Sequence, residues 1–159
     1  MDPNSMPFDT SFQHCCAIGA LLLSWQSAIG LAGSPVDPVN KNHASIAIKG
    51  YDTVAYFKEG KPMKATGQYS HSWNGATWQF SSEENRSLFA ADPTKYAPQF
   101  GGYCAWAVGH GYTANIDPEA WKIIEGKLYL NYNKDIQKKW QADSAHLIGE
   151  GERNWPKLH

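Results

Sequence analysis

The stretch "YSHSWNGATWQF", residues 69–80, constrains the fold more than any other part of the chain. Asn-Gly is the favoured dipeptide of a two-residue type I′ turn, and here it separates two runs of alternating polarity. A turn at Asn74-Gly75 pairs His71 with Trp78. Because side chains alternate along a strand, the aromatic residues then share one face with His71, and the Ser, Thr and Gln side chains share the other. The stretch predicts an antiparallel hairpin with an aromatic inner face.

A second hairpin is predicted in "WKIIEGKLYL", residues 121–130, with its turn at Glu125-Gly126. One face of this hairpin carries Trp121, Ile123, Leu128 and Leu130. The other carries Lys122, Ile124, Lys127 and Tyr129.

Capping residues in the rest of the chain predict helices and turns. Ser81 and Glu84 form a capping box that opens a helix over residues 82–91. Asp92-Pro93 and Asp117-Pro118 each cap a short turn.

Three further helices are expected. "GGYCAWAV" predicts a buried helix that ends at "GHG". Asn133 starts a helix that presents Ile136 and Trp140 to the core, and a last helix near residues 143–148 precedes the terminal "NWPKL". The predicted class is α+β, a single small domain in which two antiparallel hairpins pack with several short helices.

The composition limits the classes of protein to consider. Hydrophobic residues make up 42% of the 159 residues and aromatic residues 13%. This aromatic content favours a compact fold and argues against disorder, which needs few aromatics and a large net charge. The formal net charge is −1, and no basic stripe stands out. Nucleic acid is therefore not expected as a partner.

The first 32 residues form an apolar N-terminal segment. Its densest part, residues 15–25, has the length of a signal-peptide core and is short for a membrane span. Gly30 and Ala32 offer a small-residue cleavage site, but no Lys or Arg precedes the run, and residues 1–5 look like a vector remnant. We predict a degenerate export signal; the alternatives are an uncleaved membrane anchor and a helix that packs on the domain.

An export signal predicts a periplasmic or secreted protein, which touches a membrane only if the segment is retained. Residues 33–42, with two prolines, are expected to form a linker. Residues 43–159 are expected to form the domain.

Cys104 is the only cysteine that follows the N-terminal segment. Three cysteines with no CxxC pair exclude a disulfide framework and a zinc ribbon. No Lys or Arg neighbours Cys104, so burial would raise the pKa of its thiol, whereas the helix N-terminus after the double glycine would lower it. Three roles stay open for Cys104: packing, metal ligation and nucleophilic catalysis.

His71 and His110 are the candidate nitrogen ligands. His71 lies on the aromatic face of the first hairpin, where it is either a ligand or a core histidine. His110 follows Cys104 by six positions, about 240° on one helix, so the two side chains meet only if Gly109 breaks the helix. Otherwise His110 is a loop residue facing solvent.

Tyr51, Asp52, Tyr103 and Trp106 are the further pocket candidates, and Asp52 is also expected to start a helical turn. No carboxylate pair stands out as an acid/base dyad, and no GxSxG, HExxH or P-loop motif is present. The sequence therefore predicts no catalytic residue and identifies no small-molecule substrate.

With these features in place, the chain resembles YHS-domain proteins of the longer, stand-alone exported bacterial kind. The resemblance runs from about residue 46 to residue 158. It rests on "IKGYDTVAYF", the stretch from "YSHSWNGATWQF" to "GGYCAWAV", "DPEAW", "GKLYLNYN" and "NWPKL".

Short YHS domains beside heavy-metal pumps are thought to bind metal through cysteines. In this sequence, Ser81 and Asn85 stand at two of those cysteine positions, and the early cysteine is absent from "KGYDTVAY". Cys104 belongs to "GGYCA", which is a feature of the longer family. The resemblance therefore carries over the fold and not the thiol site.

Two functions follow. The first is a small exported module that binds a soft or borderline transition metal through Cys104 with His71 or His110; thiolate and imidazole suit copper, zinc or iron, and copper is favoured. The second is a non-catalytic structural or partner-binding domain without metal. An enzyme ranks last.

Overall fold

The computed structural model describes residues 34–159, so the predicted export signal lies outside the described residues. Two antiparallel hairpins form two separate sheets, β1 (Tyr69–Trp73) with β2 (Ala76–Phe80) and β3 (Asp117–Ile124) with β4 (Lys127–Asn131). The helices are α1 (Thr53–Lys58), α2 (Glu83–Ala91), α3 (Pro93–Tyr96), α4 (Ala105–Gly109), α5 (Lys134–Ala142) and α6 (Ser144–Leu158), with short 3-10 turns η1 (Ile48–Gly50) and η2 (Phe100–Gly102). The α+β class is confirmed.

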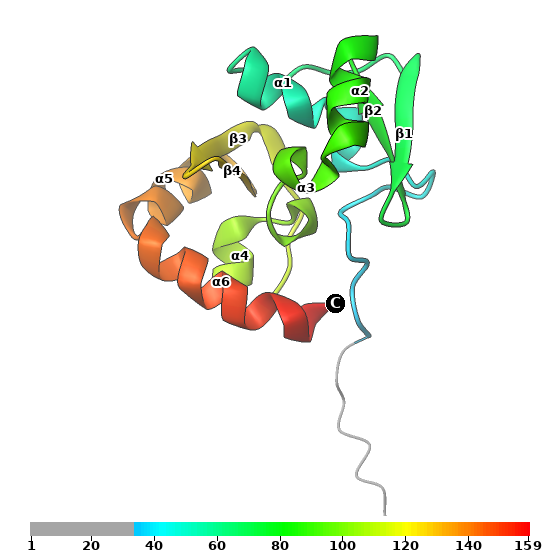
Figure 1. Ribbon diagram of the computed structural model, residues 1–159. Coiled ribbons are helices and arrows are strands. Elements are labelled where there is room, and N and C mark those ends of the chain that lie inside the picture. Colours follow the sequence, from blue (N-terminus) through cyan, green and yellow to red (C-terminus); the bar gives the residue numbers. More distant parts are fainter. Residues whose placement is uncertain (1–33) are drawn as a thin grey trace, which may run out of the picture. The chain divides into compact units, whose positions relative to one another are not determined.

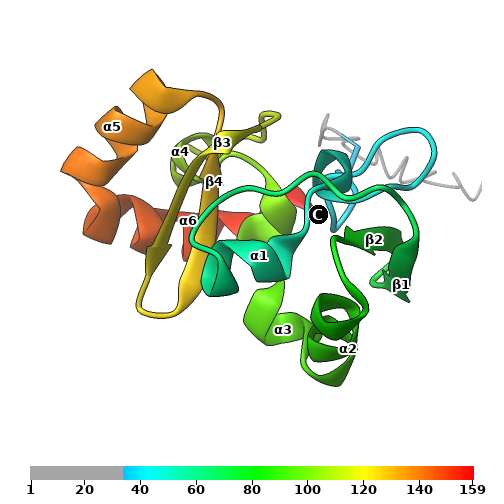
Figure 2. The ribbon, with the colours of Figure 1, turned by 90° about the horizontal axis from the view of Figure 1, so that it is seen from above.

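The elements gather into two groups, one around each hairpin. Helices α1 and α2 accompany β1 and β2, whereas α4, α5 and α6 surround β3 and β4; α3 lies between the groups (Figures 1 and 2). Among residues 34–159, no helix is long and apolar enough to cross a membrane.

The first hairpin has the predicted register. His71 pairs with Trp78 and Tyr69 with Phe80. In β2 the inner side chains are buried and the outer ones only half-buried. Asn74 and Gly75 both have positive φ, as a type I′ turn requires.

The second hairpin also has the predicted register, with Trp121 opposite Leu130. Its first strand is longer than expected. Asp117-Pro118 was expected to cap a turn, but β3 begins at Asp117, which pairs with Asn131 ahead of a bulge. The Asp117 carboxylate accepts a hydrogen bond from the backbone N–H of Glu119 at 2.9 Å. The local side-chain bond expected of Asp117 is therefore made, but inside a strand and not at a turn.

Two helix boundaries differ from the prediction. The N-cap of α2 is Ser82 rather than Ser81, and its hydroxyl accepts from the N–H of Asn85. Helix α6 continues to Leu158 instead of ending near residue 148, with Pro156 inside its last turn. The continuation packs Trp155 against Phe100, at a ring-centroid distance of 6.4 Å, which gives the terminal stretch a tertiary reason to stay helical.

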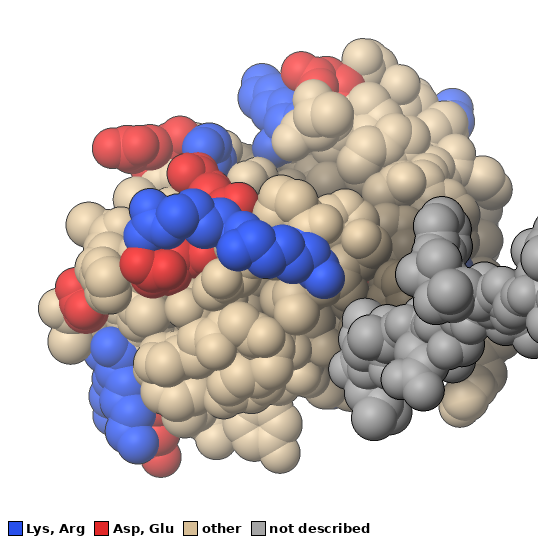
Figure 3. Space-filling model, turned by 90° about the horizontal axis from the view of Figure 1, so that it is seen from below, with Lys and Arg blue, Asp and Glu red and all other residues tan. Residues whose placement is uncertain are grey.

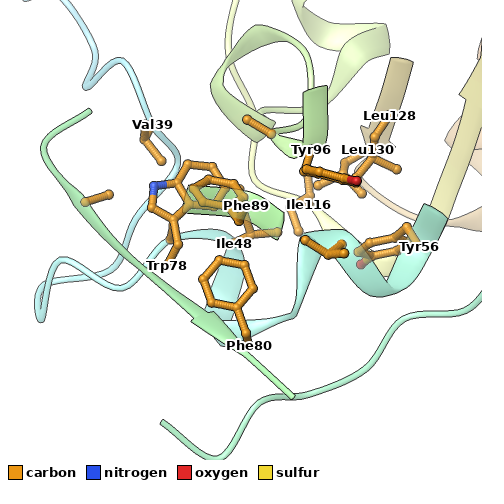
Figure 4. Packing of buried hydrophobic residues seen from close by; sticks show 14 of the residues in the cluster. Val39, Ile48, Tyr56, Trp78, Phe80, Phe89, Tyr96, Ile116, Leu128 and Leu130 are labelled. Atoms are coloured by element: carbon orange, nitrogen blue, oxygen red, sulfur yellow. The ribbon is translucent and has the colours of Figure 1, made fainter. Parts of the chain in front are cut away.

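The main core is aromatic and lies between the first hairpin, α2 and the segment that contains Val39. Phe89 of α2 is fully buried, with its ring centroid 4.9 Å from that of Trp78 and 5.0 Å from that of Phe80 (Figure 4). Val39 is 1% exposed and packs in the same cluster. Part of the segment expected as a linker is thus joined to the domain.

The turns η1 and η2 are left-handed, because all three residues of each have positive φ. This conformation costs residues other than glycine about 1–2 kcal/mol each. Asn40 holds both turns: its N–H donates to Gly101 O at 2.8 Å, its carbonyl accepts from Ile48 N, and its side chain donates to Gly102 O at 3.1 Å. The Ile48 side chain lies where a Cβ on Gly102 would stand, 2.2 Å away.

We predict that Gly102→Ala lowers the free energy of unfolding by about 2–5 kcal/mol, from left-handed strain plus the clash with Ile48. The matched control is Gly60→Ala, which also has positive φ (+65°) but no neighbour within 4 Å of the added Cβ, and should cost about 1 kcal/mol. Urea unfolding of both variants is the measurement. Equal losses would show that the packing of the two turns contributes nothing.

Candidate functional site

Cys104 sits where three segments meet. It is the N-cap of α4, it forms a parallel bridge with Leu130 of β4, and its N–H donates to Ala114 O at 3.0 Å. The residue is 1% exposed. These backbone contacts hold the sulfur in the wall of a small cavity.

The cavity has a volume of about 220 Å³ and is mostly apolar. Its lining consists of Cys104, Trp106, Ala107, Tyr112, Ala114, Tyr132 and Ile136. Among the described residues, the two exposed large hydrophobic side chains are Tyr112, at 47%, and Tyr132, at 55%, and both line this cavity. Concave apolar sites edged by a few polar groups are the usual form of a small-ligand pocket.

The thiol of Cys104 is held in its neutral form. Burial raises the pKa of Cys104, and the backbone N–H groups of Ala107, Tyr132 and Trp106 offset only part of that rise. The S–H group donates a long bond, 3.8 Å, to Oδ1 of Asn131. Both effects expected from the sequence are present, and burial is the larger.

Asn131 is the polar residue behind the cavity and is fully buried. Its Oδ1 also accepts from the N–H of Trp106 at 3.2 Å, which fixes the first turn of α4 to the end of β4. Its Nδ2 has no hydrogen-bond partner among the described residues. Asn131 was not among the predicted site residues, since its only signal in the sequence was its place at the end of a predicted strand.

His71 lies in the other group of elements. It is half-buried and contacts Phe89 edge-on, with a ring-centroid distance of 6.1 Å. Strand β1 packs on β2 and α2, whereas α4 packs on α6, α5 and β4. Both ribbon views show β1 apart from α4 (Figures 1 and 2).

His110 is exposed and lies at the end of α4, where Gly109 ends the helix as the sequence suggested. Its ring stacks on Trp106 at 3.9 Å, and its Nδ1 lies 2.7 Å from Trp106 O. His110 therefore supports a wall of the cavity from outside.

Tyr51 and Tyr103 do not line this cavity. Tyr51 bridges to Lys64, whose Nζ lies 5.0 Å from the ring centroid. Tyr103 packs on Trp155 at 5.8 Å, and burial, followed by the charge of Asp37, raises the pKa of Tyr103. Of the four further pocket candidates, Trp106 alone joins Cys104.

Asp52 belongs to a different constellation, a buried hydrogen-bond network. It is fully buried and caps α1, with Oδ1 accepting from the N–H groups of Val54 and Ala55. Its Oδ2 accepts from Ser81 N at 2.9 Å, Ser81 Oγ at 2.6 Å and Asn85 Nδ2 at 2.7 Å. The resemblance to the shorter family implies that Ser81 and Asn85 stand at cysteine positions, and in this structure both side chains bind the Asp52 carboxylate.

The donor groups do not converge. Within residues 34–159, no group of three or more His, Cys, Asp and Glu side chains is placed to hold a metal ion. The three predicted ligands, Cys104, His71 and His110, are therefore not assembled as a preformed site. Metal ligation by Cys104 with one histidine stays a prediction.

Comparison with known proteins adds one match. Residues 54–100 match the family model of the YHS domain. No curated protein and no solved structure matches the chain. The match covers Ser81 and Asn85 and ends before Cys104, so the cavity lies in the part of the chain that follows the matched segment.

We predict that Asp52→Asn lowers the free energy of unfolding by about 2–4 kcal/mol, because an amide nitrogen would face donors that now share a carboxylate. Asp92→Asn is the control, since Asp92 is an exposed N-cap whose carboxylate binds Lys95 N and Thr94 Oγ1. It should cost under about 1 kcal/mol. Similar losses in urea unfolding would contradict a structural role for the buried network.

We also predict that Cys104 reacts with iodoacetamide at pH 8 at least about tenfold more slowly in the native protein than in the protein unfolded in urea. The reason is that the native thiol is buried and its pKa is raised. The native rate should rise with pH beyond the range in which an ordinary thiol titrates. A native rate equal to the unfolded rate at pH 8 would show that the thiol is accessible and ionises normally.

Proposed function

Since residues 54–100 form a YHS domain, we propose that this protein is a non-catalytic binding module whose cavity beside Cys104 takes an apolar group of a ligand or protein partner. The observation that carries the proposal is the cavity itself. It is concave, its lining is mostly apolar, and two exposed tyrosines form its rim.

The size of the cavity limits what it can hold. A volume of about 220 Å³ fits one aromatic ring or one branched aliphatic group, since an engineered protein cavity of about 150 Å³ binds benzene. Trp106, Tyr112 and Tyr132 provide aromatic surface for such a group. We further propose a protein that works after export and does not bind nucleic acid; acidic and basic side chains alternate on the face in Figure 3, with large uncharged areas between them.

A second candidate function is binding of a single copper ion. It is favoured by the position of Cys104 in the cavity wall and of His110 on the outer side of Trp106. The family's link to metal handling supports it as well. Against it stand the neutral thiol and the amide and hydroxyl that replace the cysteines at Asn85 and Ser81.

Two measurements separate the candidates. The first is the metal content of protein purified without a histidine tag, compared with that of Cys104→Ser. The proposed function predicts no stoichiometric metal in either protein. About one copper per chain that disappears in Cys104→Ser would overturn it in favour of the copper candidate.

The second measurement is a toluene titration followed by NMR. We expect saturable shifts at Cys104 and its cavity neighbours. Ala114→Leu, which fills the cavity, should abolish these shifts, whereas Ala142→Leu, at an exposed position on α5 outside the cavity, should leave them unchanged. Shifts of equal size in all three proteins would contradict the proposed site.

A further inference from the structure

A second cavity, which shares α5 with the Cys104 cavity, has a different chemistry. It has a volume of about 480 Å³ and lies among β3, α5 and Tyr56 of α1. This volume is within the range of small-molecule sites. None of the residues that line it also lines the Cys104 cavity.

The charged groups in its lining are both cationic. They are Lys122 of β3 and Lys134, the first residue of α5, and no acidic side chain lines the cavity. Neither lysine forms an ion pair among the described residues, although six other basic residues do. Lys134 Nζ donates to the backbone carbonyl of Glu119, which holds the ammonium at the cavity and leaves two of its N–H groups free.

The floor of the cavity is aromatic. Trp121 is half-buried, and its ring contacts Tyr56 edge-on at a centroid distance of 5.1 Å. The Tyr56 hydroxyl is used in a bond to Pro118 O at 2.9 Å, so Tyr56 offers only apolar surface. An indole fixed in this way provides a flat surface for a planar ligand.

A buried amide completes the site. Gln137 is 9% exposed, and its Nε2 donates to Trp121 O, which fixes the side chain. Its Oε1 is the acceptor atom of a side chain that lines the cavity. An amide oxygen accepts hydrogen bonds, so it can take one from a hydroxyl or N–H group of a ligand.

We propose that this cavity binds a small planar organic anion, with its ring on Trp121, its carboxylate or phosphate at the Lys134 ammonium with Lys122 at the edge of the cavity, and a donor group directed to Gln137. Lysine ammonium groups bind carboxylates and phosphates as mobile point charges, which suits a site open to solvent. The proposal is independent of the function proposed for the Cys104 cavity.

The test uses three probes and the full chain. In NMR titrations, 4-hydroxybenzoate should give saturable shifts in β3 and α5. The neutral analogue 4-hydroxybenzamide should bind at least fivefold more weakly, because it lacks the charge. Inorganic phosphate, an anion without a ring, should also bind more weakly. Raising the salt concentration from 20 to about 200 mM should weaken binding of the benzoate severalfold.

Variants locate the effect. Lys134→Gln should weaken 4-hydroxybenzoate binding about five- to tenfold, and Lys122→Gln should weaken it less, both without changing the unfolding midpoint. Lys138→Gln is the matched control, since Lys138 is on the same helix but pairs with Asp135 and does not line the cavity. Equal affinity for the benzoate and the benzamide, an equal effect of Lys138→Gln, or no saturable shift at all would each overturn the proposal.

Discussion

The buried carboxylate of Asp52 is the constraint on which the first half of the structure depends. One oxygen starts α1, and the other binds Ser81 and Asn85, so a single side chain joins a helix, the end of β2 and the first turn of α2. Buried polar groups of this kind stabilise a fold only when all their hydrogen bonds are made, and here five donors serve the two oxygens. The Ser81 and Asn85 side chains are therefore part of the hydrogen-bond network of Asp52 in this fold.

The matched family segment and the candidate ligand site lie in different parts of the chain. Ser81 and Asn85, which the resemblance places at cysteine positions of the shorter family, both bind Asp52 here. The remaining cysteine after the N-terminal segment lies beyond the matched residues, between α4 and β4. The cavity beside it is lined mostly by apolar and aromatic side chains, which is the lining that the proposed apolar ligand requires.

Local sequence signals predicted the hairpins well, because Asn74-Gly75 and Glu125-Gly126 determine both turn and register. They failed where tertiary contacts decide. The Ser81 hydroxyl was assigned to a cap but binds a carboxylate 29 positions earlier, and α6 continues because Trp155 packs on Phe100. No local pattern reports such contacts.

The candidate site was predictable only in part. The apolar stretch around Cys104 indicated burial, and Trp106 was chosen as its neighbour. Tyr112, Tyr132 and Asn131 were missed because they come from a loop and from the end of β4, which meet Cys104 only in the folded chain. His71 was placed on the correct face of its hairpin. Its neighbour on that face could not be predicted, because it is Phe89 of α2, which packs on β1 only in the folded chain.

The most direct measurement is a crystal structure of the protein under xenon pressure, since xenon enters apolar cavities without needing any polar contact. The account predicts xenon density beside Cys104, bordered by Trp106 and Ile136, with the sulfur unmodified and no metal bound to it. A metal ion on the sulfur, or a cavity that excludes xenon because the side chains have closed it, would contradict the account.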